Sequence, residues 1–308
     1  MELLDQIAIN KVRRVFRAKH KLTSPNVVSH ITQRAAGKEP LFVEDRDYLY
    51  MLANMKEIAK KRSLEMYAFC LMTNHVHILA SPKDDELDDA MRDLFSRYAM
   101  WFNRKYERKG HLFGGPYRQA VCLDDGYLLA ASVYIHLNPV KAGLASAAED
   151  YRWSSVRLYC EEEAPRSFVN PSFVLNMVSA KAGKGKEIYR DLLYRSATVE
   201  TRPVFEEEDV IERFRTRLAS LFPPIFKKMA GRNRAGKGAG LELISVDALE
   251  ERIKNLHHDP FRNGPESRPA KKYLIEQLIS RGYKRREIAG KLGVSRKTIY
   301  NILNSAAS

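Results

Sequence analysis

The sequence predicts an α+β fold in which helices pack on a sheet of antiparallel strands. Between about residues 26 and 159, short apolar runs with strand spacing alternate with longer segments of helical spacing. Two of the apolar runs, residues 64–72 and 75–80, are separated only by Thr73 and Asn74. A polar two-residue break between such runs is typical of an antiparallel hairpin.

The remaining elements of this region follow from the same patterns. Residues 26–32 are expected to form a strand, 44–61 a helix, 85–109 a long helix and 111–123 a further strand. The next helix opens at Asp124 and is expected to end at Asn138, because a residue before proline is biased out of the helical region.

Beyond about residue 160 the pattern changes to helical fragments separated by glycine- and lysine-rich stretches, such as 181–186 and 231–240. Such stretches are typical of flexible connections. We therefore predict a first domain over residues 1–160, a helical and linker region over 161–265, and an all-α C-terminal unit over 266–308.

The composition indicates a polyanionic partner. The chain has 308 residues and a formal net charge of +14, and nucleic acid is the commonest partner of so basic a protein. We find no apolar run of membrane-spanning length and no signal-peptide core, so we expect a cytoplasmic protein without a membrane partner. The three cysteines are far apart in the sequence and fit neither a disulfide framework nor a zinc knuckle.

Two histidines in the predicted strand 75–80 form a candidate metal site. Because side chains alternate along a strand, His75 and His77 point to one face while Val76 and Ile78 point to the other. Two imidazoles at this spacing can share a divalent ion and leave positions for substrate oxygens. Many such pairs are ordinary polar residues on a half-exposed strand, and the spacing alone leaves that alternative open.

The helix after Asp124 carries a candidate nucleophile. Helical spacing places Tyr127, Ala131, Tyr134 and Asn138 on one stripe. Tyr134 could instead be a core aromatic and Asn138 a helix terminator. Together with the histidine pair, however, the residues suggest that a metal ion polarises a phosphodiester and that the tyrosine hydroxyl attacks it, which forms a covalent phosphotyrosine.

Four stretches, YAFCLMTNHVHILA, KGHLFGGPYRQAV, YIHLNPVKAGL and YRWSSVRLY, resemble the single-tyrosine HUH transposases (IS200-like), in particular the REP-associated tyrosine transposases. The resemblance spans about residues 26–160. It implies a ferredoxin-like sheet, Tyr134 as the nucleophile, and His75, His77 and Asn138 as ligands of Mg²⁺ or Mn²⁺. It also implies an endonuclease and strand transferase that acts on single-stranded DNA beside palindromic hairpins and leaves a 5′-phosphotyrosine.

Tyr117 and Arg118 lie where this family has aromatic and basic residues near DNA. An aromatic side chain can stack on an unpaired base, and an arginine can contact a phosphate. A surface arginine in an ordinary ion pair is an equally good interpretation of Arg118.

The C-terminal residues 284–303 have the spacing of a helix-turn-helix, with Gly293 at the turn and Ser295 as the cap of the second helix. The second helix is expected to present side chains suited to phosphates and base edges of duplex DNA: Arg296, Lys297, Tyr300 and Asn301. A helical hairpin that binds nothing remains the alternative.

For the whole protein, the alternative function is a domesticated DNA-binding regulator that no longer cuts, and the oligomeric state stays open.

Overall fold

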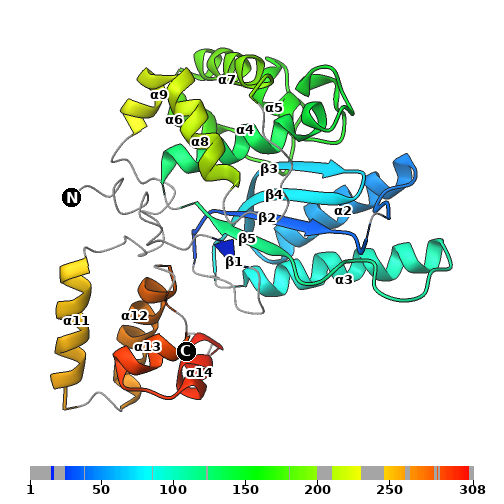
Figure 1. Cartoon of the computed structure of the whole chain (residues 1–308). Helices are drawn as coiled ribbons and strands as arrows, with labels where there is room; N and C mark the ends of the chain where they lie inside the picture. Colours follow the sequence, from blue (N-terminus) through cyan, green and yellow to red (C-terminus); the bar gives the residue numbers. More distant parts are fainter. Residues whose placement is uncertain are drawn as a thin grey trace. The chain divides into compact units, whose positions relative to one another are not determined.

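The computed structural model describes residues 15–16, 25–37, 39–84, 86–122, 124–179, 181–199, 210–229, 246–260, 264–280, 283 and 285–304. The chain divides into two compact units (Figure 1). The larger unit is Val15–Gly238, and the described elements of the smaller one lie between residues 246 and 304.

The larger unit is built on a five-stranded antiparallel sheet. Its strands are β1 (Val15–Phe16), β2 (Ser29–Arg34), β3 (Leu64–Met72), β4 (His75–Pro82) and β5 (Arg118–Val121), in the spatial order β1-β5-β2-β4-β3. One helix connects β2 to β3 and another connects β4 to β5. Apart from the short edge strand β1, this chain order and the spatial order β5-β2-β4-β3 are those of a ferredoxin-like fold. The predicted α+β class is confirmed.

One face of the sheet is apolar and contributes to the main core. Ile31 on β2 and Val76 and Ile78 on β4 point to this face and are completely buried. Helix α2 (Asp45–Lys61) packs on β3 and on helix α3 (Leu87–Lys105). The hairpin between β3 and β4 turns at Thr73 and Asn74, as the sequence predicts.

Helix α4 (Asp125–Lys141) packs on β3 and β4 and is the central helix of the unit, because thirteen of its seventeen residues are buried. Four helices from the region after residue 160 contact it. These helices, which lie around α4 in Figure 1, are α6 (Ser172–Val178), α7 (Ala182–Ser196), α8 (Val210–Leu221) and α9 (Pro223–Met229). This part of the predicted linker region is therefore packed structure.

The predicted end of α4 at Asn138 is wrong, because the helix continues through Pro139 to Lys141. Proline lacks an N–H, but in the last turn this removes only one helical hydrogen bond. The helix stops at Gly143, whose φ of +69° favours glycine. There the Leu144 N–H donates to the Pro139 carbonyl at 2.8 Å. The predicted long helix and the fourth strand of the region are also shorter than expected, at Leu87–Lys105 and Arg118–Val121.

The smaller unit consists of α11 (Val246–His258), α12 (Arg268–Ser280), α13 (Arg285–Leu292) and α14 (Arg296–Asn304), after a short 3-10 turn, η2 (Pro265–Ser267). Gly293 lies in the turn between α13 and α14 with a φ of +63°. The Thr298 N–H donates to Ser295 Oγ at 3.0 Å, so Ser295 caps α14. The turn and cap have the predicted positions. Arg296, Lys297, Tyr300 and Asn301 are all exposed, and their contact with DNA stays a prediction.

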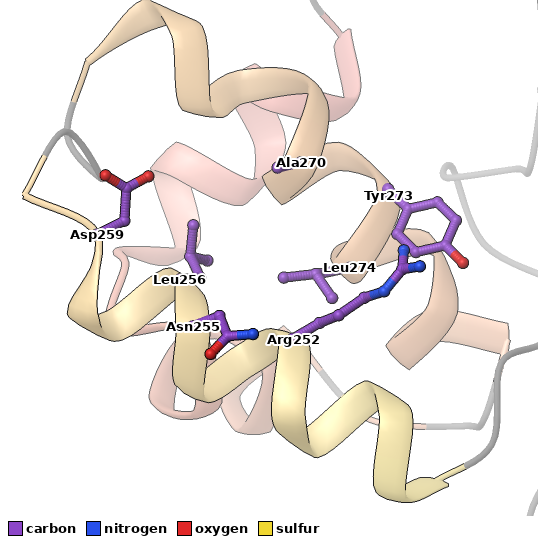
Figure 2. Close-up of a pocket in the computed structure, with 7 residues that line it drawn as sticks. All are labelled: Arg252, Asn255, Leu256, Asp259, Ala270, Tyr273 and Leu274. Atoms are coloured by element: carbon purple, nitrogen blue, oxygen red, sulfur yellow. The ribbon is translucent and has the colours of Figure 1, made fainter.

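Residues of α11 and α12, with Asp259, line an open pocket of about 370 Å³ (Figure 2). Its lining includes Arg252, whose guanidinium lies 5.2 Å from the ring centre of Tyr273. None of the helices in the described part of the chain is long and apolar enough to cross a membrane.

Candidate active site

The strand register gathers polar side chains on the sheet face that α4 covers. In the β2–β4 pair, Thr32 lies opposite His77 and Arg34 lies opposite His75. Because residues directly opposite one another share a face, these four side chains lie on the side away from the apolar face. The rings of His75 and His77 are perpendicular, with centroids 4.8 Å apart.

Both histidines are buried, with exposed fractions of 5% for His75 and 4% for His77. Burial, and then the charge of Arg34, lowers the pKa of His75 to about 4. Burial, and then the neighbouring His75 and His30, holds the pKa of His77 well below its usual value. The imidazoles are therefore neutral near pH 7, which is the form that binds a metal ion.

Hydrogen bonds occupy the Nδ1 atom of each histidine. His75 Nδ1 donates to the side-chain oxygen of Asn74 at 2.7 Å, so its lone pair is on Nε2. His77 Nδ1 lies 2.9 Å from His30 Nε2 and 3.2 Å from Thr32 Oγ1. Its own Nε2 is buried and makes no hydrogen bond among the described residues. Metal-ligating histidines are commonly oriented in this way, through the nitrogen that does not bind the metal.

His30 is a member of the site that the sequence analysis missed. Its ring stacks on His77 with centroids 5.1 Å apart, and only 6% of the residue is exposed. Burial, and then the charge of His75, lowers the pKa of His30 to about 4. The two-residue spacing of His30 and Thr32 indicates a shared face, but only the pairing of β2 with β4 brings His30 to His77.

Tyr134 lies over this group of histidines. Its ring centroid is 6.0 Å from that of His77 and 6.3 Å from that of His30, with edge-to-face geometry in both pairs. The ring also contacts Phe214 of α8, at a centroid distance of 5.9 Å. Burial raises the pKa of the Tyr134 hydroxyl to about 12. The structure thus brings Tyr134 and the histidine pair together, as the sequence interpretation requires.

Asn138 follows Tyr134 by one helical turn. Its side-chain amide N–H donates to the Tyr134 carbonyl at 2.9 Å, which leaves the amide oxygen as the part of the group that could bind a metal. The described residues contain no group of three or more His, Cys, Asp and Glu side chains suited to a metal ion. The assignment of a divalent ion to the Nε2 atoms of His75 and His77 and to this amide oxygen therefore stays a prediction.

The two residues predicted to contact single-stranded DNA have different surroundings. Tyr117 is only 8% exposed, and its hydroxyl donates to Asp88. This packing leaves little of its ring for a nucleotide base. Arg118 is exposed at the start of β5 and lies opposite Thr32, on the same face as the histidines.

Part of the chain is similar to known proteins. The model of the family described as "Transposase IS200 like" matches residues 23–138. No curated protein sequence matches the chain. Among solved structures, the "Structure of the REP associates tyrosine transposase bound to a REP hairpin" matches at 12% identity with a TM-score of 0.42. The match covers 50% of this chain and 94% of that one.

Proposed function

We propose that this protein, whose residues 23–138 match the model of the family described as "Transposase IS200 like", is a transposase that cuts and rejoins single-stranded DNA beside a palindromic hairpin, with Tyr134 as nucleophile. The observation that carries the proposal is the position of Tyr134. Its ring centroid lies 6.0 Å from that of His77 and 6.3 Å from that of His30, and burial keeps both imidazoles neutral near pH 7.

In the proposed reaction, the Tyr134 hydroxyl oxygen forms a bond to the phosphorus of a phosphodiester while the bond from phosphorus to the 3′-oxygen breaks. The phenol proton ends on the 3′-oxygen, so the products are a 5′-phosphotyrosine and a 3′-hydroxyl. One phosphodiester replaces another. The step can therefore be reversed by another 3′-hydroxyl without ATP, which is the requirement for strand transfer.

His75 and His77, with the amide oxygen of Asn138, would hold Mg²⁺ or Mn²⁺. A divalent ion bound there would polarise the phosphodiester and offset the charge that develops on its oxygens. The protein's own part is to keep the imidazoles neutral by burial and to hold their orientation through Asn74, Thr32 and His30.

The DNA partner is supported by charge and by exposed side chains. The chain has a formal net charge of +14, and Arg118 is exposed on the face of the sheet that carries the histidines. We propose that Arg118 contacts the single strand and that α14 contacts neighbouring duplex in the cytoplasm. In α14 the proposed contacts are the exposed side chains Arg296, Lys297, Tyr300 and Asn301.

The test is incubation with labelled single-stranded oligonucleotides from around the protein's own gene, with Mn²⁺ or with EDTA. The wild type should form a covalent protein–DNA adduct on a denaturing gel in Mn²⁺ only. Tyr134→Phe keeps the ring but removes the nucleophile, so it should fold and bind DNA without forming an adduct. His77→Ala should abolish the adduct, and Asn138→Ala should reduce it less, because water can replace a neutral amide.

Two results would contradict the proposal. An adduct formed by Tyr134→Phe would assign the nucleophile to another residue. Specific DNA binding by a wild type that forms no adduct with any divalent metal would instead indicate a regulator that no longer cuts.

A further inference from the structure

The ammonium group of Lys141 is buried and pairs with no anion among the described residues. It lies in the last turn of α4, seven residues after Tyr134, and its Nζ is buried without a hydrogen bond or an ion pair among the described residues. The nitrogen lies 4.2 Å from the ring centre of Phe214 and 5.5 Å from that of Tyr134. Its immediate surroundings are therefore two aromatic rings.

An ammonium group in this position carries an energetic cost. Burial lowers the pKa of Lys141 to about 8, so the group is still mostly protonated near pH 7. Cation–π contacts with the two rings compensate only part of the lost hydration. Buried charges in proteins are nearly always paired with an anion or a metal-bound group.

Contacts at the C-terminal end of α4 do not explain why the charge of Lys141 is buried. A cation in the last turn of a helix is favoured by the helix dipole, but Lys141 Nζ donates to none of the terminal carbonyls. Those carbonyls have other partners, since the N–H groups of Ala142 and Leu144 donate to Asn138 and Pro139. The acidic side chain of Glu212 on α8 pairs with Arg215.

We propose that Lys141 binds a phosphate oxygen of the single-stranded DNA at Tyr134 and is thus a substrate-contacting residue of the site. The inference rests on the proposed function and adds a specific cation to it. Residues seven apart lie on the same face of a helix, about 10 Å apart along its axis. The flexible four-carbon stem of lysine can carry its ammonium from the Phe214 ring to a phosphate beside the Tyr134 hydroxyl.

The experiment measures binding in a Tyr134→Phe background, in which cutting cannot interfere. The probe is a labelled mixed-sequence single-stranded oligonucleotide, titrated at several salt concentrations. Lys141→Gln should bind about tenfold more weakly or worse, as expected for loss of a charged hydrogen bond. Its slope of log affinity against log salt should fall by about 0.7, the value for one phosphate contact to a single strand.

Two matched variants separate a phosphate contact from other effects. Lys141→Arg keeps the charge and should retain most of the affinity and the slope. Lys60→Gln removes the same charge from an exposed position on α2 and should change both much less. Lys141→Gln should also unfold at the same temperature as the parent or higher, because it removes a buried unpaired charge.

Equal affinities and slopes for Lys141→Gln and Lys60→Gln would overturn the proposal. A lower unfolding temperature together with weak binding that Lys141→Arg does not restore would assign Lys141 to packing. The proposed function fails separately, when the wild type forms no covalent adduct. Because the salt slope is measured without cutting, that failure leaves the test of Lys141 intact.

Discussion

At the level of single residues, three buried histidines, His30, His75 and His77, lie on one face of the sheet. His77 is held on its Nδ1 side by His30 and Thr32, while its Nε2 stays available. Burial keeps the imidazoles neutral. A ring held in this way loses less rotational freedom when it binds a metal.

His30→Ala tests the positioning role of the third histidine. Without its partner the His77 ring is less well oriented, so the Mn²⁺ concentration needed for half-maximal adduct formation should rise about 10- to 100-fold. His30→Gln can still hydrogen-bond to His77 Nδ1 and should show a smaller shift. The measurement is a Mn²⁺ titration of adduct formation, and identical titrations for His30→Ala and the wild type would exclude this role.

At the scale of elements, a buried carboxylate joins the start of α2 to the end of α3. The Asp47 side chain accepts hydrogen bonds from the N–H groups of Val43 and Glu44 and from the Tyr106 hydroxyl, and it pairs with Lys105. Burial alone would raise the pKa of Asp47, but Lys105 and the two N–H donors outweigh it and lower the pKa. The side chain is not exposed at all.

Asp47→Asn should destabilise the protein by about 1 to 3 kcal/mol, because it removes one of the two carboxylates that pair with Lys105 and leaves the Val43 and Glu44 N–H groups only a neutral acceptor. The folded pKa of Asp47 lies below its unfolded value, so its stabilising effect is present above about pH 4. That effect is lost as the pH falls through the folded pKa. The free energy of unfolding in urea should therefore depend less on pH below pH 4 for Asp47→Asn than for the wild type.

Asp45→Asn is the matched control, because Asp45 in the same helical turn is 63% exposed and pairs with an exposed arginine. It should change stability by less than about 1 kcal/mol. Equal losses of stability for the two variants would show that the buried contacts of Asp47 contribute no more than the exposed ion pair of Asp45.

At the scale of the whole molecule, α4 depends on helices far along the sequence. Its buried residues face the sheet on one side and α6 to α9 on the other. A protein ending at Tyr159 would expose this apolar surface and should neither unfold cooperatively nor form the adduct. A protein ending at Gly238 keeps the larger unit intact and should do both. Cooperative unfolding of the shorter protein at the same denaturant midpoint would contradict this view of α4.

The smaller unit is expected to contribute duplex affinity. Replacing Arg296 and Lys297 by alanine in the full chain should weaken binding to hairpin targets that contain duplex. It should also lower the salt slope by about one unit for each phosphate that the protein no longer binds. Nicking of short single strands should be unaffected. Lys60→Ala with Lys61→Ala is the charge-matched control on α2, and equal effects from the two pairs would assign the loss of affinity to net charge.

Several parts of this protein depend on local pattern and can be predicted from the amino-acid sequence. The hairpin of β3 and β4 and the start of α2 follow from spacing and turn residues. The spacing of His75 and His77 predicts that they share one face of the sheet, as they do, and the role of Tyr134 as nucleophile stays a prediction. The cap of α14 also follows from the position of Ser295.

Which distant side chains meet depends on long-range packing, and local pattern does not predict it. The alternation of side chains along a strand predicts which face of β2 carries His30. The register that brings His30 to His77, however, depends on the long-range pairing of β2 with β4. Phe214 likewise meets Tyr134 and Lys141 only because α8 packs on α4. Tyr117 is buried for a similar reason, since its hydroxyl donates to Asp88 on α3. Local propensity cannot encode these contacts, because burying apolar surface across the whole unit determines them.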